Sequence, residues 1–254
     1  MKRRRANQIV ALLKSIETGD PGPVAVVDQT RYIQHNPQTH EGSEGLEALF
    51  KRLSRTNPRV TALRAFEDGD YVFAHMEYDF SALKICFEVF RFEGERAVEH
   101  WDNIQPIAAA NRSGHTMVDG PVDARDLDQT EANRQIIRDF AETVLIPANA
   151  SRLSRFINTK TFVEHNPFLS DDLGQLRAAL SADAGVQPAL RYDRLHRVLA
   201  EGNFVLSVCE GRLNGAHSAF YDLFRLDDGL IAEHWDTTET VAPKSQWKNE
   251  NGKF

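Results

Sequence analysis

The sequence predicts an α+β protein built from two similar halves, and three observations lead to this prediction. The tetrapeptide Glu-His-Trp-Asp occurs at Glu99–Asp102 and again, 134 residues later, at Glu233–Asp236. Two more segments repeat in the same order: YIQHNP returns as FVEHNP after 130 residues, and GD-YVFAH returns as GN-FVLSV after 133 residues. In each half, segments with helical periodicity precede segments that alternate like strands. Helices followed by strands are typical of a mostly antiparallel sheet with helices on one face.

A duplicated domain accounts for these repeats. Residues 88–102 and 222–236 align without a gap, and six of the fifteen positions are identical. A solenoid would repeat after only ~20–50 residues. The segment between the halves is polar and rich in glycine, serine and aspartate. We therefore predict a first domain at 1–110, a linker at 111–127 and a second domain at 128–254.

The first half is expected to contain three helices and four long strands. Apolar residues at helical spacing predict the first helix, and residues 23–32 form a second, short one. Ser43 is in place to cap the third, whose apolar residues are Leu46, Leu49, Phe50 and Leu53. Strands follow at VTALRAF, YVFAHMEYDF, ALKICFEVFRF and AVEHWDNIQ, separated by turn residues such as Asp68-Gly69 and Glu93-Gly94.

The second half repeats this plan. Residues 128–131 read DQTE and fit a capping box that opens a helix containing Ile136, Ile137, Phe140 and Val144. Leu173, Leu176 and Leu180 indicate the last helix of this half. Strands are expected at LRYDRLHRVL, FVLSVCEGRL, SAFYDLFRL and LIAEHWDTTETV.

Composition excludes several functional classes. The net charge of −7 argues against a nucleic-acid partner, and no apolar run approaches the ~20 residues needed to span a bilayer. Lys14 and Glu17 interrupt what would be the apolar region of a signal peptide, so we expect a cytoplasmic protein without a membrane partner. Cys86 and Cys209 lie in apolar strand-like stretches and are expected to be reduced.

The repeated motifs resemble those of a known family. YIQHNP, the Gly-Asp turn before a strand, the FR-x-x-x-G segment and the late EHWD are similar to the SnoaL-like polyketide cyclases of the nuclear-transport-factor-2-like superfamily. The resemblance covers nearly the whole chain, once per half. It implies a tandem repeat of two cone-shaped α+β barrels, each a curved sheet wrapped around about three N-terminal helices with a pocket at its open end. Because members of the family commonly dimerise, it also implies that the halves form an intramolecular pseudo-dimer, open to further homo-oligomerisation.

Strand alternation divides the EHWD motif between two faces of the sheet. Glu99 and Trp101 point one way, where Arg91 can pair with Glu99, and this face is interpreted as structural. His100 and Asp102 point the other way. Two residues of the preceding strand, Glu88 and Phe90 in the first half, are expected to share this second face. In the second half the same face gathers Asp222, Phe224, His234 and Asp236.

The chemistry of this second face predicts an acid/base site. A buried carboxyl group beside another carboxylate has a raised pKa and can exchange protons. The resemblance assigns the role of general acid/base to Asp102 and Asp236, with Glu88 and Asp222 as further polar pocket residues. It also places His35 and His165, which precede Asn-Pro, at the pocket mouth, each directed at the aspartate of its half. Hydrogen bonding to the neighbouring acid is an alternative role for His100 and His234, and closing a helix end for His35 and His165.

Three functional hypotheses follow. The first is a cofactor-independent cyclase, isomerase or hydratase that acts on a small carbonyl-containing or polycyclic apolar molecule, with His100, His234 or a protonated acid stabilising the enolate. The second is a non-catalytic ligand-binding or scaffold protein. The third is a metal site, because His35, His100 and Asp102 match the ligand count of a facial triad. The resemblance argues against a metal, so neither a metal nor another cofactor is expected.

Overall fold

The structure is a computed structural model that describes residues 4–181 and 188–254. The chain divides into two compact units, which are considered one at a time. Unit 1 consists of Met1–Pro106 together with Val241–Phe254, and unit 2 consists of Ile107–Thr240. We refer to residues 107–126 as the first tail and to residues 241–254 as the second tail. The first tail follows the last strand of unit 1 but belongs to unit 2. The second tail follows the last strand of unit 2 but belongs to unit 1.

This division differs from the predicted domain boundaries of 1–110, 111–127 and 128–254. The segment predicted as a linker packs as part of unit 2, and the last fourteen residues pack as part of unit 1. Polar composition suggested a linker, but here the polar side chains are used in hydrogen bonds, such as that from Asn111 Nδ2 to the Glu164 carbonyl at 2.6 Å. Asn249 of the second tail bonds in a similar way to the carbonyls of Asn36 and Thr39.

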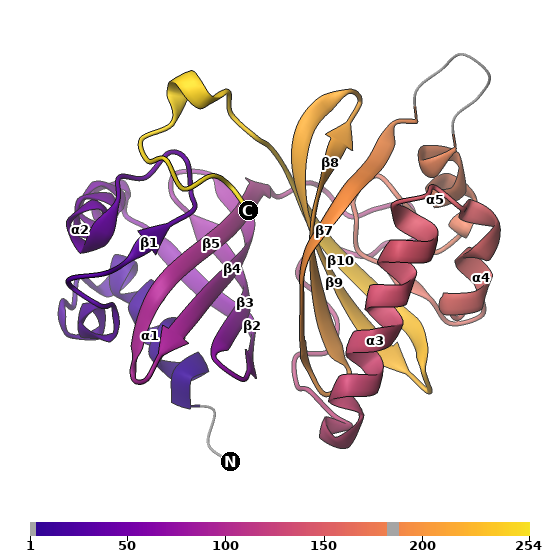
Figure 1. Ribbon diagram of the computed structural model, residues 1–254, viewed down its shortest axis with the longest axis horizontal. Helices are drawn as coiled ribbons and strands as arrows, with labels where there is room; N and C mark the ends of the chain where they lie inside the picture. The colour runs from indigo at the N-terminus through magenta and orange to yellow at the C-terminus, as the bar shows by residue number, and fades with distance from the viewer. Residues whose placement is uncertain (1–3, 182–187) are drawn as a thin grey trace. The chain divides into compact units, whose positions relative to one another are not determined.

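Unit 1 is a five-stranded sheet with helices packed against it (Figure 1). Its strands lie in the order β1-β5-β4-β3-β2; β1 is parallel to β5 and the other neighbours are antiparallel. The strands are β1 (Ile33–Gln34), β2 (Arg59–Asp68), β3 (Tyr71–Asp79), β4 (Leu83–Glu93) and β5 (Arg96–Pro106). The helices are α1 (Arg4–Thr18) and α2 (Gly42–Leu53), with short 3₁₀ turns η1 (Gly22–Val26) and η2 (Ser54–Thr56).

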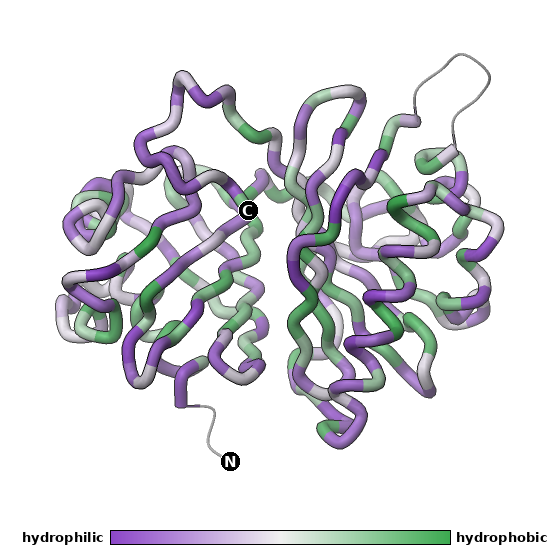
Figure 2. The backbone as a smooth tube through the Cα atoms, viewed as in Figure 1, coloured by the Kyte–Doolittle hydropathy of each residue, from purple (hydrophilic) through white to green (hydrophobic). Residues whose placement is uncertain are grey.

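Helix α1 supplies much of the core of unit 1. Ile9, Leu12, Leu13 and Ile16 recur at helical spacing, and each is at most 4% exposed. They pack with apolar side chains of β2 and β3. Hydrophobic and hydrophilic stretches both occur along the strands, as Figure 2 shows. Within β4, Cys86, Phe90 and Phe92 share one face and belong to this core.

Unit 2 has the same strand order, β6-β10-β9-β8-β7, with β6 parallel to β10. The strands are β6 (Val163–Glu164), β7 (Leu190–Glu201), β8 (Phe204–Leu213), β9 (Ala216–Asp227) and β10 (Leu230–Thr240). Helices α3 (Thr130–Phe140), α4 (Leu153–Phe156) and α5 (Leu173–Leu180) accompany them. The π-helical segment η4 (Ala141–Leu145) directly follows α3. The remaining 3₁₀ turns are η3 (Leu127–Gln129), η5 (Ala150–Arg152) and η6 (Lys244–Gln246), the last of which lies in the second tail.

The long strands are found where the sequence predicts them, whereas two helix starts are not capped as expected. Ser43 does not cap α2; its hydroxyl donates to the Gln29 carbonyl instead. The expected capping box at 128–131 is replaced by the turn η3, and Thr130 donates to the Leu127 carbonyl. The helix predicted over 23–32 is only the 3₁₀ turn η1, after which the chain continues into β1. Among the helices of the described residues, none is long and apolar enough to cross a membrane.

Candidate active site

The sheet face of unit 1 that packs against helix α1, which we call the interior face, carries a polar cluster. We call it the first cluster. In the β4–β5 hairpin, Glu88 lies opposite Asp102 and Phe90 lies opposite His100, as alternation predicts. All three polar side chains are buried. Because burying charged groups costs free energy unless they are paired, their partners decide what this cluster can do. The members of the first cluster are Gln34, Asn36, Tyr78, Glu88, His100, Asp102 and Lys253.

His100 is fixed at both ring nitrogens. Its Nδ1 lies 2.9 Å from Oε1 of Gln34, and its Nε2 lies 2.5 Å from Oε2 of Glu88. Gln34 Oε1 also accepts the Asn36 backbone N–H, so this atom is an acceptor and Nδ1 must be the protonated donor. The other oxygen of Glu88 accepts the Tyr78 hydroxyl at 2.7 Å, and burial next to Glu88 raises the pKa of Tyr78 well above its usual value.

Asp102 is bound by an amide and by a lysine. Asn36 Nδ2 donates to Oδ2 at 2.6 Å, and Lys253 Nζ lies 3.4 Å from Oδ1. The lysine side chain is only 1% exposed, although it is the next-to-last residue of the chain. Burial raises the pKa of Asp102, but Lys253, His100 and Asn36 together outweigh burial and hold that pKa below its usual value. Asp102 is therefore ionised at neutral pH.

The interior face of unit 2 carries a matching second cluster with different partners. Its members are Glu164, Asn166, Tyr192, Asp222, His234 and Asp236. His234 Nδ1 lies 2.8 Å from Glu164, which stands where unit 1 has Gln34, and Nε2 lies 3.3 Å from Asp222. Burial lowers the pKa of His234, but Glu164 and Asp222 outweigh it and raise that pKa well above its usual value. His234 is thus a buried imidazolium between two carboxylates.

Asp236 differs from Asp102 in its charge environment. It lies opposite Asp222 in the β9–β10 hairpin, and Asn166 Nδ2 donates to both of its oxygens, at 2.9 and 2.8 Å. Burial raises the pKa of Asp236, and the charges of Asp222 and Glu164 raise it further, whereas His234 and Asn166 lower it. The result is a pKa of about 7. A carboxyl group with this pKa can both take and give a proton near neutral pH.

His35 and His165 do not approach these aspartates, contrary to our expectation. His35 Nε2 lies 2.8 Å from Glu99, its Nδ1 donates to the Gly252 carbonyl, and its ring stacks on Trp101 at 4.6 Å. His165 has a similar arrangement with Glu233, the Thr116 carbonyl and Trp235, and its Nδ1 also lies 2.8 Å from Oδ1 of Asp119. Both histidines therefore lie on the face of Glu99 and Trp101 or their counterparts. Arg91 and Arg225 complete the two networks by the predicted pairs with Glu99 and Glu233, at 2.6 and 2.7 Å.

Several members of the clusters were missed from the sequence. The asparagine of His-Asn-Pro, Asn36 or Asn166, is the residue that reaches the aspartate, so the motif was informative but the wrong side chain was chosen. Tyr78 and Tyr192 bind Glu88 and Asp222, and strand alternation could have found them. Lys253 has no local pattern that would connect it with a residue 151 positions away.

A metal ion fits the first cluster poorly. Ligand atoms of Glu88, His100 and Asp102 lie within 4.8 Å of one another, whereas the facial triad considered from sequence used His35, which is engaged elsewhere. The Lys253 ammonium lies against Asp102 and would repel a dication at this place. Both nitrogens of His100 are also already hydrogen-bonded. We therefore assign none of these residues to a metal.

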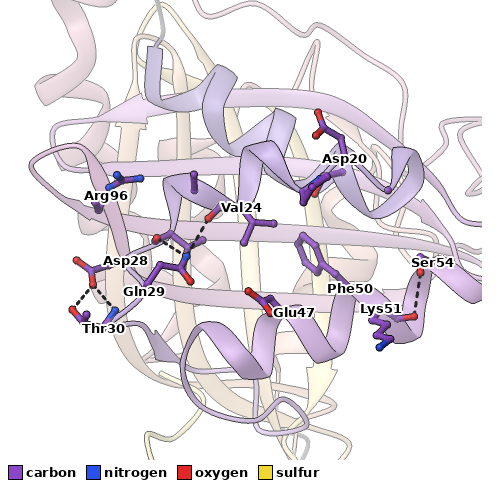
Figure 3. Close-up of a pocket in the computed structure, with 15 residues that line it drawn as sticks. Asp20, Val24, Asp28, Gln29, Thr30, Glu47, Phe50, Lys51, Ser54 and Arg96 are labelled. Carbon is purple, nitrogen blue, oxygen red and sulfur yellow. Dashed lines mark hydrogen bonds between the residues drawn. The ribbon is translucent and has the colours of Figure 1, made fainter.

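Two hollows differ in size and in lining. The smaller, of about 20 Å³, lies inside unit 2, and its lining includes Glu164, Tyr192, Asp222 and His234 among apolar side chains. That volume is about what one water molecule requires. The larger is a groove of about 830 Å³ beside η1 and α2 of unit 1 (Figure 3). Val24 and Phe50 form apolar parts of its wall, and charged residues such as Asp20, Glu47, Lys51 and Arg96 lie around it. None of the predicted site residues lines this groove.

Parts of the chain are similar to known structures. No protein-family model matches it, and no curated protein matches it in sequence. TsrD from Streptomyces laurentii is 21% identical over 41% of this chain and 92% of its own, with a TM-score of 0.36. IdmH from Streptomyces antibioticus, described as a candidate polyketide cyclase, is 14% identical over 41% and 93%, with a TM-score of 0.36. A ketosteroid-isomerase-like protein from Catenulispora acidiphila, solved with trimethylamine, is 19% identical over 37% and 82%, with a TM-score of 0.32.

Proposed function

We propose that unit 2 is a cofactor-independent acid/base enzyme that moves a proton next to a carbonyl group of a small molecule. The observation that carries this proposal is the buried carboxyl of Asp236, whose pKa of about 7 suits a general base at neutral pH. An acid that is half ionised near the working pH accepts a proton and returns it with little cost in either direction.

The other members of the second cluster have supporting roles. Asp236 takes a proton from the carbon next to the substrate carbonyl, and the negative charge moves to the carbonyl oxygen. The imidazolium of His234 stabilises that charge electrostatically, since its two N–H groups are already held by Glu164 and Asp222. Return of the proton from Asp236 to another position completes an isomerisation or a cyclisation. The hollow of about 20 Å³ is lined by His234 and Asp222 but not by Asp236, so binding of a substrate against Asp236 requires the residues around the hollow to move.

We also propose that both units are cones of the SnoaL-like group and derive from one ancestral domain. The repeated HNP and EHWD motifs support this proposal. The equal strand orders β1-β5-β4-β3-β2 and β6-β10-β9-β8-β7 support it as well. After duplication the first cluster would have diverged, because Asp102 is ionised and paired where Asp236 is not.

Deuterium exchange into a small 1,3-diketone tests the proposed chemistry without knowledge of the natural substrate. The protein is incubated in D₂O with small 1,3-diketones, and loss of the proton next to the carbonyl is followed by NMR. We expect the rate to rise with pH through about 7, since only ionised Asp236 is a base. The Asp236→Asn variant should lose this rise, with a decrease of ~10²-fold or more. The matched Asp102→Asn variant should retain it. Equal rates in wild type and Asp236→Asn would refute the proposal.

The groove in unit 1 favours a second candidate, binding of a small apolar ligand without catalysis. Its volume of about 830 Å³ is within the ~300–1,000 Å³ typical of ligand sites. Anilinonaphthalene sulfonate, whose fluorescence increases in apolar sites, is a suitable probe. We expect Phe50→Asp to weaken its binding at least ~10-fold, whereas Phe168→Asp, at an exposed phenylalanine of unit 2, should have no effect. Equal binding by both variants would exclude this groove.

A further inference from the structure

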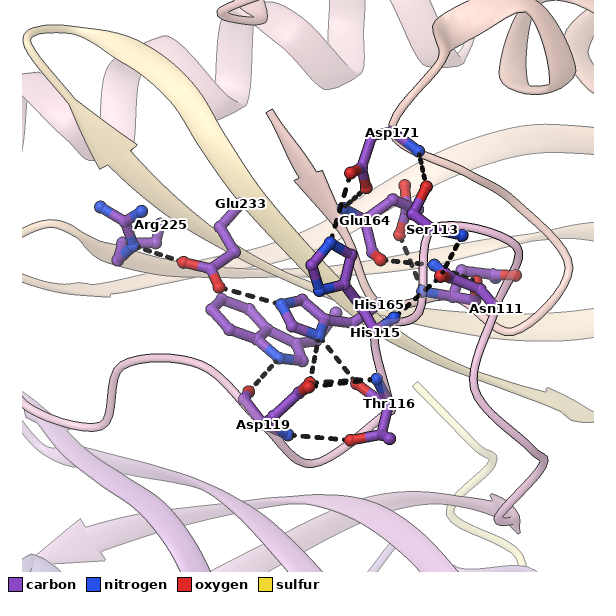
Figure 4. A network of polar contacts seen from close by, with 12 residues as sticks. Asn111, Ser113, His115, Thr116, Asp119, Glu164, His165, Asp171, Arg225 and Glu233 are labelled. Atoms are coloured by element: carbon purple, nitrogen blue, oxygen red, sulfur yellow. Dashed lines mark hydrogen bonds and ion pairs between the residues drawn. The ribbon is translucent and has the colours of Figure 1, made fainter. Parts of the chain in front are cut away.

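The two tails occupy matching places in the two units, as shown by the histidine that each tail binds. His35 Nδ1 donates to the carbonyl of Gly252 at 3.0 Å, and His165 Nδ1 donates to the carbonyl of Thr116 at 2.7 Å. In both units the backbone N–H of this histidine donates to the carbonyl of the interior histidine, at 2.9 Å. Figure 4 shows the unit 2 arrangement, with Thr116 and Asp119 of the first tail around His165.

The next residue of each tail is buried but differs in charge. Lys253 follows Gly252 and Met117 follows Thr116, and both are 2% exposed. The lysine reaches Asp102 in the first cluster, whereas methionine has no charge to offer the second cluster. Lys253 and Met117 thus each directly follow the carbonyl that binds the histidine of their unit.

We propose that Lys253 is a positioning residue which the second tail brings to the first cluster to keep Asp102 ionised, whereas Asp236 can exchange its proton because the described residues place no such ammonium against it. The buried lysine thereby separates two similar clusters by charge. This inference concerns the charge of the clusters and holds whether or not unit 2 converts a substrate.

One further charged neighbour differs between the two clusters. Asp102 is faced by His100 on β5, Glu88 on β4, Tyr78 on β3 and Tyr32 before β1. Asp236 is faced by His234 on β10, Asp222 on β9, Tyr192 on β7 and Glu164 on β6. Each set contains one histidine, one tyrosine of the adjoining strands and the cross-strand acid. The sets differ by the extra tyrosine Tyr32, by Gln34 in place of Glu164, and by the buried ammonium.

Direct titration of the two carboxyl groups tests the inference in the full-length protein. Aspartate is labelled with ¹³C at the carboxyl carbon, and the signals of Asp102 and Asp236 are assigned with the Asp→Asn variants. In the wild type we expect the Asp236 signal to titrate near 7 and the Asp102 signal to remain that of a carboxylate from pH 5 to 8. In Lys253→Met, the Asp102 midpoint should rise by about 1–3 pH units, because an opposite charge at this distance lowers a pKa by that amount.

Control variants separate charge from packing. Lys248→Met removes a charge from an exposed position of the same tail and should leave the Asp102 midpoint unchanged. Lys253→Arg keeps the charge and should also keep the midpoint low, whereas Lys253→Gln should raise it even if Lys253→Met does not fold. An unchanged Asp102 midpoint in the folded Lys253→Gln or Lys253→Met variant would overturn the inference. A rise of equal size in Lys248→Met would overturn it too.

Discussion

At the scale of single residues, two differences give the two clusters their different charges. Glu164 stands where unit 1 has Gln34, and it adds a carboxylate next to the interior histidine. Lys253 brings an ammonium to Asp102, whereas no lysine or arginine among the described residues forms an ion pair with Asp236. The cross-strand pairs Glu88–Asp102 and Asp222–Asp236 are otherwise equivalent. The same hairpin geometry therefore supports an ionised aspartate in one unit and a protonatable aspartate in the other.

The raised pKa of Asp236 predicts how stability depends on pH. The folded protein holds this proton more tightly than the unfolded chain does, so the free energy of unfolding should fall as pH rises from about 4 to about 7. Asparagine mimics the neutral acid and does not ionise, so the Asp236→Asn variant should lack this part of the decline. Between pH 4.5 and pH 8, its free energy of unfolding should therefore increase relative to that of the wild type by a few kcal/mol. Urea unfolding at the two pH values measures the difference.

Asp102→Asn is the matched control, and its effect on stability should depend on pH in the opposite direction. The pKa of Asp102 is lowered, so its ionised form contributes stability above the usual carboxyl pKa, and this contribution is lost as pH falls through the folded pKa. Removing it also leaves the buried ammonium of Lys253 without this partner. We expect a loss of about 3–5 kcal/mol at pH 7. The assignment would be wrong if the two variants changed stability with the same dependence on pH.

Alternation placed the residues of EHWD on the faces that the structure shows, whereas the direction that the resemblance implied for the two histidines before Asn-Pro was wrong. Residues 99–102 lie on a long strand, where a period of two assigns each side chain to a face. His35 follows β1, which has two residues and was predicted as the end of a helix. Since Gln34 pairs with His100 and Ile33 with Glu99, the parallel register puts His35 on the side of Glu99. The missing information was the pairing of a strand too short to recognise in the sequence.

At the scale of elements, the first tail is attached to a turn of the sheet as well as to His165. In unit 2, the backbone N–H of Asn203 donates to the Arg125 carbonyl, and the Arg125 N–H donates to the Asn203 side chain, both at 2.9 Å. The turn between β7 and β8 thus holds the end of the first tail. Both turns could be predicted from Gly69-Asp70 and Gly202-Asn203 in the sequence. The contact between the first tail and the Gly202-Asn203 turn could not.

These two turns provide a matched pair of substitutions. Gly69 and Gly202 both have left-handed backbone conformations, with φ of 57° and 60°, so alanine costs about 1–2 kcal/mol at either position. A Cβ at Gly69 meets nothing within 4 Å, whereas at Gly202 it lies 2.0 Å from the Arg125 carbonyl oxygen. We expect Gly202→Ala to destabilise the protein by at least about 2 kcal/mol more than Gly69→Ala, because the tail must leave the turn. Equal losses in thermal unfolding would show that the tail contact contributes nothing.

At the scale of the whole molecule, the two units are compact, and each includes the segment that follows the last strand of the other. Internal repeats predicted two α+β domains with similar strands, because the repeats lie in the strands themselves. They could not predict which unit each tail joins, since both tails are short and bind residues about fifty or more positions away. Assigning a tail to a unit depends on long-range hydrogen bonds that have no period in the sequence.

The tail assignment predicts how the chain can be divided. A fragment of residues 107–240 retains the contacts that the first tail makes to His165 and Trp235, at 2.7 and 3.0 Å. A fragment of residues 128–254 lacks them and carries the second tail without the residues it binds. Because each lost buried hydrogen bond costs about 1 kcal/mol, we expect the first fragment to melt at least roughly 5 °C higher. Circular dichroism of both fragments measures this difference, and equal melting temperatures would favour the boundaries predicted from sequence.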